Sequence, residues 1–415
     1  RIVLHDDVAL APCPWLRAAF SDPPRGMKLL YKTGWPDASV HYRPPGSDAW
    51  HTEPLTAVPG APGWKSITLE KGAAEFVMRN NEGTQWDNPP PEAGTKNYVI
   101  PATGGAEATG TWTLAGGRLT RVLEGAPVLV VSDLDHTMVG HEKDPDDALL
   151  REFQAAWLGR YAFGGSCLVY STGRNKSEAL AVARERGLLR PTLLVCGVGT
   201  EVYEVPEDLP LGPDGGAWAE DPSKITREAS WTRLMAGSFN RDSVEELLRS
   251  RFPKFEIRGN PEHDPYRIPT SYEVDAEMPE NFRLVREALG PSVEVIASGG
   301  NEWKLVDFCS SSAGKMKACE FVMERLGIPP ERTLVCGDSG NDESMYRCPK
   351  VRGVAVGNSL PELVASLKSM AKPGPEAVQQ GATFTTASDS VVFYANRNVA
   401  GAIVEALGAF WPTQN

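Results

Sequence analysis

An apolar segment, Pro127–Ser132, is followed immediately by two aspartates, Asp133 and Asp135. A run without polar alternation is typical of a strand that is buried on both faces of a parallel sheet. Such a sheet needs helices on both faces, so we expect an α/β layer structure around this strand. Both aspartates would then lie at the carboxyl end of the strand, which is the edge where open α/β sheets bind ligands.

Strand and helix patterns alternate after this segment. The predicted elements are helices over 145–158 and 177–186 and strands over 167–171, 192–196 and 333–337. This alternation predicts a doubly wound parallel sheet. Residues 207–297 interrupt the alternation with helical patterns over 241–251 and 279–289 and with β-like runs over 272–274 and 293–297. We therefore expect an inserted α+β cap.

The first part of the chain has a different texture. Short alternating runs separated by Gly, Pro, Asn and Asp are typical of an all-β sandwich. The predicted strands lie at 27–31, 40–43, 64–69, 74–79 and 110–114. The resulting division is a lead segment over 1–26, a β-sandwich over 27–124, an α/β core over 125–206 and 298–415, and a cap over 207–297.

The charge balance restricts the partners of the chain. Its 415 residues carry a formal net charge of −12, which argues against nucleic acid or an anionic membrane as a partner. We find no stretch long enough for a membrane helix and no signal-peptide pattern. The seven cysteines include no Cys-x-x-Cys pair, and most lie in apolar runs, so we expect buried, reduced thiols and an intracellular, soluble protein.

Three further polar motifs follow predicted strands or open predicted helices. Thr172, Gly173 and Arg174 follow one strand, where a hydroxyl and the amides of a helix N-terminus suit a phosphate oxygen, although the same residues also suit a helix cap. Lys315 opens a later helix and could neutralise phosphate. Asp338 and Asp342 lie in a Gly-rich turn after another strand.

These motifs together predict a metal site. Three carboxylates in one crevice would repel one another strongly unless a cation lay between them. Carboxylate oxygens are the hard ligands that Mg²⁺ prefers. The sequence therefore predicts Mg²⁺ as the cofactor, with Asp338 and Asp342 as candidate oxygen ligands in the same crevice as Asp133 and Asp135.

The order of these motifs resembles that of the haloacid-dehalogenase (HAD) phosphatase superfamily, and a longer similarity is to sucrose-phosphate phosphatases. It rests on Ser-Asp-Leu-Asp-His-Thr-Met-Val (132–139), Tyr-Ser-Thr-Gly-Arg (170–174), Val-Gly-Thr-Glu-Val-Tyr (198–203), Ala-Ser-Gly-Gly (297–300), Cys-Gly-Asp-Ser-Gly-Asn-Asp (336–342) and Ala-Gly-Ala-Ile-Val-Glu-Ala-Leu (400–407). The similarity covers residues 127–411.

The resemblance implies roles for the motif residues. Asp133 would form an aspartyl-phosphate, and Asp135 would act as general acid and then general base. Thr172 and Lys315 would hold phosphoryl oxygens. Mg²⁺ would be bound by Asp133, Asp338, the backbone carbonyl of Asp135, and Asp342 directly or through water. Further phosphate or substrate contacts are implied for Leu134, Gly173, Arg174, Thr200, Glu201, Glu262, Arg267, Ser339, Asn341 and Asn358.

The cap departs from the family pattern. Arg267 stands where the family has a lysine, and Glu302-Trp303-Lys304 stands where it has Asp-x-Asp. These differences leave the phosphate chemistry intact and leave the identity of the sugar open.

A second resemblance covers about residues 27–122 and is to starch-binding modules with a Trp-Asp-Asn signature. It implies a binding platform of His41, Trp50 and Trp86, with Asn88 as a polar partner. Aromatic faces suit the apolar faces of sugar rings. For Trp64 and Trp112 we expect positions in the sandwich core.

The chain is thus predicted to be a Mg²⁺-dependent sugar-phosphate phosphatase, similar to sucrose-6-phosphate phosphatases, that is tethered to starch or another α-glucan. The alternatives are a catalytically silent glucan-binding scaffold and a phosphatase of a different sugar phosphate or of phosphoglucan. A glucan partner would favour a plastid, with the cytoplasm as the alternative.

Overall fold

The computed structural model of the chain describes residues 26–100, 109–123, 126–140, 147–212, 216–299 and 302–412. It divides into two compact units. The first unit comprises the residues up to 127 together with 154–166 and 207–212, and the second comprises the remainder. Residues 1–25 of the predicted lead segment lie outside the described residues.

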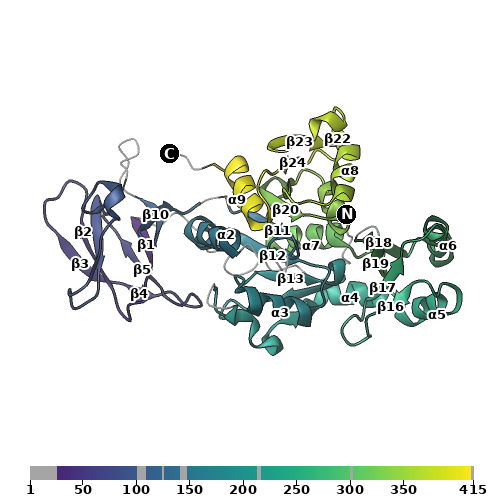
Figure 1. The fold of residues 1–415 in the computed structure, drawn as a ribbon. Helices are drawn as coiled ribbons and strands as arrows, with labels where there is room; N and C mark the ends of the chain where they lie inside the picture. Colours follow the sequence, from purple (N-terminus) through teal and green to yellow (C-terminus); the bar gives the residue numbers. More distant parts are fainter. Residues whose placement is uncertain are drawn as a thin grey trace. The chain divides into compact units, whose positions relative to one another are not determined.

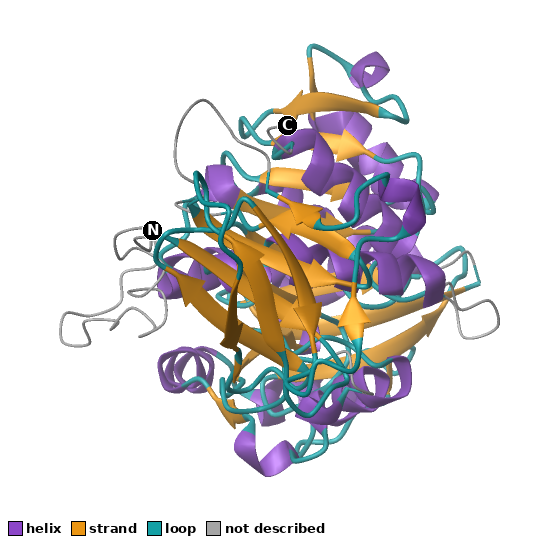
Figure 2. Cartoon of the chain, turned by 90° about the vertical axis from the view of Figure 1, so that its left-hand side faces the viewer, coloured by secondary structure: helices purple, strands orange, loops and turns teal. Residues whose placement is uncertain are grey.

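The first unit is built from two β-sheets, which face the viewer in Figure 2. One sheet has the order β10 (Arg118–Arg121), β9 (Gly110–Ala115), β1 (Met27–Lys32), β5 (Trp64–Leu69) and β4 (Thr56–Ala57). The other has the order β3 (His51–Pro54), β2 (Ser39–Arg43), β6 (Glu75–Arg79) and β7 (Trp86–Asp87), with β8 (Tyr98–Val99) also paired to β6.

Apolar side chains from both sheets meet in one core. Leu29 and Tyr31 of β1 contribute from one sheet, and Val40 of β2 and Phe76 of β6 contribute from the other. Their alternation along each strand is what the period of two predicts for a sandwich. Trp64 is buried, and Trp112 packs against this core from a partly buried position.

The second unit contains a ten-stranded sheet. Its order is β15 (Thr226–Arg227), β14 (Glu201–Glu204), β13 (Leu193–Cys196), β12 (Cys167–Ser171), β11 (Leu129–Ser132), β20 (Thr333–Gly337), β21 (Arg352–Ala355), β24 (Val391–Tyr394), β23 (Ala382–Thr386) and β22 (Ala371–Lys372). The strands from β13 to β24 are parallel, and the outer ones are antiparallel. The predicted α/β fold with a parallel core is confirmed.

The described α-helices lie between strands of this sheet, in the cap, or, for the last of them, after the final strand. They are α2 (Asp147–Arg160), α3 (Lys176–Arg186), α4 (Ala229–Ser238), α5 (Arg241–Arg251), α6 (Met278–Leu289), α7 (Lys315–Leu326), α8 (Pro361–Met370) and α9 (Val399–Phe410). None of the helices in the described part of the chain is long and apolar enough to cross a membrane.

A separate antiparallel sheet forms the cap, in the order β16 (Glu256–Ile257), β17 (Arg267–Glu273), β19 (Trp303–Ser310) and β18 (Val293–Ser298). Helices α5 and α6 cover the face of this sheet that points away from the ten-stranded sheet (Figure 1). Side chains such as Phe255, Val306 and Phe308 form the apolar core between them.

The cap extends beyond its predicted end at residue 297. Strand β19 pairs with β17 over seven positions and with β18 over six, so residues up to Ser310 complete the cap sheet. At the other end, β15 pairs with β14 in the ten-stranded sheet, so Thr226 and Arg227, which the sequence assigned to the cap, belong to the core sheet. The sequence did not show this because the prediction places the boundary at the family motif Ala-Ser-Gly-Gly (297–300) and assigns residues from 298 onward to the core.

Candidate active site

Three neighbouring parallel strands end at the same edge of the core sheet. Strand β11 lies between β12 and β20, and Ser132 at its end is in register with Tyr170 and Cys336. Each strand is followed directly by a polar residue: Asp133 follows β11, Thr172 follows β12 and Asp338 follows β20. Side chains that are far apart in sequence are therefore brought to one place, as the strand pattern predicted.

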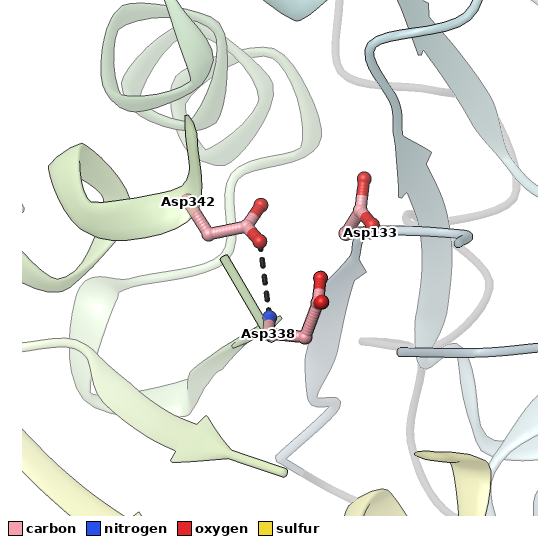
Figure 3. A group of neighbouring side chains, drawn as sticks. All are labelled: Asp133, Asp338 and Asp342. Carbon is pink, nitrogen blue, oxygen red and sulfur yellow. Dashed lines mark hydrogen bonds between the residues drawn. The ribbon is translucent and has the colours of Figure 1, made fainter. Parts of the chain in front are cut away.

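Three aspartates gather at this edge (Figure 3). Oxygen atoms of Asp133, Asp338 and Asp342 all lie within 4.8 Å of one another, and all three residues are buried. Asp342 comes from a short helical segment, Gly340–Arg347, and one of its oxygens accepts the amides of Asp338 (3.0 Å) and Ser339 (3.1 Å). A Cβ atom on Gly337 would lie 2.4 Å from the Cβ of Asp342, so the approach of this carboxylate requires glycine there.

Lys315 supplies the positive charge within this group. Its side chain is fully buried, and its ammonium donates to Asp133 (2.7 Å) and to Asp342 (2.6 Å). The start of α7 lies close against Gly199. A Cβ on Gly199 would lie 2.5 Å from the carbonyl of Gly314, so this approach requires glycine at position 199. Burial alone would lower the pKa of Lys315, but the carboxylates of Asp133 and Asp342 outweigh it and raise that pKa.

A single ammonium does not balance three buried carboxylates. Burial raises the pKa of Asp133 to about 7, although Lys315 opposes this, and burial together with Asp342 and Asp133 raises the pKa of Asp338 to about 9. Raised values for two neighbouring carboxylic acids mean that the site lacks positive charge. A divalent cation would supply it and release both protons.

The free coordination positions fit Mg²⁺. Among the contacts of the described residues, Asp133 offers its second oxygen, and Asp338 accepts only a 3.4 Å hydrogen bond from Thr137. Asp342 already uses one oxygen for two amides and the other for Lys315. Asp133 and Asp338 are thus better placed as direct ligands, and Asp342 as a group that orients Lys315 and the loop.

Asp135 lies at the rim of a cavity of about 690 Å³, which Asp133, Asp338, Ser339, Asn341 and Gly173 also line. Both oxygens of Asp135 accept from the guanidinium of Arg174 at 2.8 Å. The structure therefore gives Arg174 a carboxylate partner, where the sequence predicted a phosphate contact. Thr172 is buried beside this loop, and its hydroxyl accepts the amide of Arg174 at 3.1 Å.

Arg267 connects the cap to the core. Its guanidinium donates to Asp264 (2.7 Å), to Asp307 (3.0 Å) and to the carbonyl of Gly173 (2.7 Å). Two carboxylates thus neutralise it: burial would lower the pKa of Arg267, but Asp307 and Asp264 raise it. It lines the cavity as a structural tie to the loop after β12 and not as a free cation.

Other predicted contact residues lie elsewhere. Glu201 is buried and paired with Arg227 (2.7 Å), and Asn358 joins the carbonyl of His136 to the amide of Val399. Thr200 donates to the carbonyl of Gly197, and the side chain of Leu134 is buried. Glu262 lines a neighbouring cavity of about 220 Å³. The cavity around Asp133 does not include these residues among its lining.

Sequence reasoning missed several lining residues, including Asp307, Leu305, Arg258 and Asn260. Alternation along β19 could have revealed two of them. Leu305 and Asp307 share one face of that strand, whereas Val306 and Phe308 point into the cap core. A strand prediction over 303–310 would have placed both on the cavity side.

In the first unit, the predicted platform residues lie together. The rings of His41 and Trp50 are stacked at 4.8 Å, and Trp86 meets His41 edge-on at 5.7 Å. The two tryptophans are exposed, at 38% and 45%. Burial and the guanidinium of Arg79 lower the pKa of His41, so its ring is neutral at neutral pH. Asn88 donates to the carbonyl of Lys96.

The second unit matches known proteins. A family model described as sucrose-6F-phosphate phosphohydrolase matches residues 126–411. The probable sucrose-phosphatase 1 of Arabidopsis thaliana is 29% identical over 302 residues, which cover 70% of this chain and 62% of that protein. Sucrose-phosphatase 1 of Nicotiana tabacum is 30% identical over 297 residues, which cover 70% and 61%. The chain spans less than two thirds of the length of these relatives.

A solved structure agrees with this similarity. The sucrose-phosphatase of Synechocystis, in complex with sucrose and phosphate, aligns with a TM-score of 0.52 and 26% sequence identity. The alignment covers 69% of this chain and 98% of that chain.

Proposed function

The chain belongs to the sucrose-6F-phosphate phosphohydrolase family of HAD-type proteins, and from this premise we propose that it is a Mg²⁺-dependent phosphatase of a sugar phosphate. The observation that carries the proposal is the buried arrangement of Asp133, Asp338, Asp342 and Lys315, of which Asp133 and Asp338 line an open cavity. A carboxylate beside a cation and a metal site is suited to attack phosphorus and to neutralise the charge of the phosphoryl group.

The proposed reaction has two steps. A carboxylate oxygen of Asp133 bonds to phosphorus while the bond from phosphorus to the sugar oxygen breaks, and Asp135 donates a proton to that oxygen. Water then attacks phosphorus, Asp135 takes its proton, and the bond to Asp133 breaks. Asp135 lines the same cavity as Asp133, and its oxygens, which accept from Arg174 in this structure, would have to turn toward the sugar oxygen and then the water for these proton transfers.

Mg²⁺, when bound, would supply charge neutralisation for the phosphoryl oxygens. Asp133 and Asp338 would hold it through their carboxylates, with the backbone carbonyl of Asp135. Lys315 donates to Asp133, which favours its anionic form, and would also neutralise charge on a phosphoryl group bound to Asp133. The sugar would lie against the cap side of the cavity, where Asn260 and the buried carboxylate of Asp307 offer hydrogen-bonding atoms.

A panel of sugar phosphates tests this proposal. We expect phosphate release from sucrose 6F-phosphate or from another sugar monophosphate, and we expect removal of the metal by EDTA to lower the rate at least about 100-fold. Colorimetric phosphate detection with and without Mg²⁺ gives the result. If no sugar phosphate is hydrolysed at any Mg²⁺ concentration, the chain is not such an enzyme, and the scaffold alternative takes its place.

We also propose that the first unit binds an α-glucan through His41, Trp50 and Trp86. The support is that Trp50 and Trp86 are exposed and that both contact the ring of His41. Exposing two large aromatic side chains to water is costly, and a bound sugar would cover them. The stacked His41 and Trp50 rings present a flat apolar face of the kind that suits a sugar ring. Binding of the first unit to an α-glucan would then keep the phosphatase unit near that glucan.

Replacing Trp86 by alanine is expected to weaken starch binding about tenfold, because the edge of the platform is removed. Sedimentation of the full chain with starch granules measures the bound fraction. Val99→Ala is the matched control, since Val99 has a similar exposed fraction (51% against 45% for Trp86) in the same unit but lies outside the ring cluster. Equal binding of Trp86→Ala and wild type would contradict this platform.

A further inference from the structure

The two faces of the cap sheet differ, because helices α5 and α6 pack on one face and residues of the other face line the cavity. Helices α5 and α6 pack on Val306 and Phe308, so the alternate residues of β19, namely Trp303, Leu305 and Asp307, lie on the opposite face. Asp307 and Leu305 line the cavity. Trp303 is the next residue outward on the same face, which therefore runs from the reaction site toward solvent.

This open face exposes large apolar side chains. Trp303 is 47% exposed and Leu305 is 50% exposed. Leu360, which is 37% exposed, also lines the cavity. Of the exposed large hydrophobic residues described in the second unit, only Leu284 lies elsewhere. Apolar exposure is thus concentrated at the mouth of the candidate active site, which is where a bound ligand would cover it.

The strip of Leu360, Leu305 and Trp303 is connected to the core through contacts of the neighbouring residue Lys304. Lys304 points to the other side of β19, and its ammonium donates to the carbonyl of Gly299 (2.7 Å) and to Glu362 (3.2 Å). Glu362 lies in α8, two residues after Leu360, and its other oxygen accepts the amide of Gly340 in the loop of Asp338 (3.1 Å). The carboxylate of Glu362 in α8 thus contacts both Lys304 of β19 and the loop that follows Asp338.

We propose that this strip binds sugar rings beyond the ring that carries the phosphate, so that the preferred substrate is a monophosphate of an oligosaccharide longer than a disaccharide. This rests on the proposed phosphatase function. A flat indole and two leucines match the apolar faces of sugar rings. Polar groups flank them for the hydroxyls: Ser298 is paired with Leu305, and Glu273 is paired with Trp303. The strip is continuous with the cavity of about 690 Å³, so one chain of rings can occupy both.

A length series of substrates tests this inference. The substrates are linear gluco-oligosaccharide monophosphates with one to four rings, together with sucrose 6F-phosphate. For wild type we expect kcat/KM to rise at least tenfold from one ring to four. Trp303→Ala should reduce this ratio to within about twofold, and Trp303→Phe should keep part of it. Because each ratio is taken within one variant, partial misfolding does not affect it.

Leu284→Ala is the control, since Leu284 is 39% exposed on the helical side of the cap. It should keep the wild-type ratio. A wild-type kcat/KM that does not rise with ring number, or an equal rise in Trp303→Ala, overturns the inference and leaves the phosphatase proposal standing. Absence of turnover on every monophosphate overturns both.

Discussion

Phosphate release should fall by about 10⁴-fold or more when Asp133 is replaced by asparagine, because the amide cannot form the acyl phosphate. The substitution keeps the size of the side chain. It also removes the negative charge of Asp133, which adds to burial and to Asp342 in raising the pKa of Asp338, while Lys315 keeps its partner Asp342. The loss of activity should therefore occur without loss of fold.

Two measurements separate these effects. Steady-state turnover on the best sugar phosphate should be lost, and the thermal midpoint without Mg²⁺ should be equal to that of wild type or higher. Asp147→Asn is the control, since Asp147 is a half-exposed carboxylate of α2 that pairs with Arg186. It should change neither measurement. Retention of more than one hundredth of wild-type activity by Asp133→Asn would show that another group attacks phosphorus.

Local sequence features were sufficient to predict that carboxylates far apart in the sequence gather at one edge of the core sheet. Asp133 and Asp338 each follow a run of apolar residues, and the parallel order of β11 and β20 is enough to bring them together. Lys315 could be proposed from its motif. Its contact with Asp342, 27 residues later, depends on the close approach of Gly199 to the start of α7, which no local pattern shows.

The cap residues could not be predicted in the same way, because their roles depend on long-range partners. Arg267 was expected to contact substrate, but Asp307, 40 residues later, neutralises it. Glu201 is similarly paired with Arg227, 26 residues later. Lys304 occupies a position at which the family pattern has an aspartate, so the sequence showed only that the charge is reversed there. The structure turns it toward Glu362 and presents its neighbours Trp303 and Leu305 on the cavity side. A motif comparison gives positions along the chain, whereas strand alternation decides which side chain faces the cavity.

Replacing Lys315 by methionine is expected to lower turnover about 10³-fold, because one charge-stabilising donor to the phosphoryl group is lost. Methionine keeps the length of the side chain but removes the cation that contacts Asp133 and Asp342. Breaking a buried ion pair by removing one partner costs about 3–5 kcal/mol when the remaining charge stays ionised. Here the remaining carboxylates can take up protons, so the cost should depend on pH.

The sign of this dependence follows from the raised pKa values. Wild-type Asp133 has a pKa of about 7 although Lys315 lowers it, so its pKa must rise further in Lys315→Met. The folded state then holds protons that the unfolded state has already lost above about pH 4, and stability falls as pH rises toward the folded-state pKa. Without Mg²⁺, the difference in thermal midpoint between variant and wild type should therefore be small at pH 5 and large at pH 8.

Lys317→Met provides a matched control two residues along the same helix. Lys317 is one-third exposed and pairs with Glu320, so its replacement should change turnover and thermal midpoint little at any pH. Mg²⁺ should restore part of the midpoint of Lys315→Met at pH 8, because a divalent cation supplies charge to the same carboxylates. Equal destabilisation of Lys315→Met at pH 5 and pH 8, with no response to Mg²⁺, would show that Lys315 acts through packing alone and that the carboxylates are not a metal site.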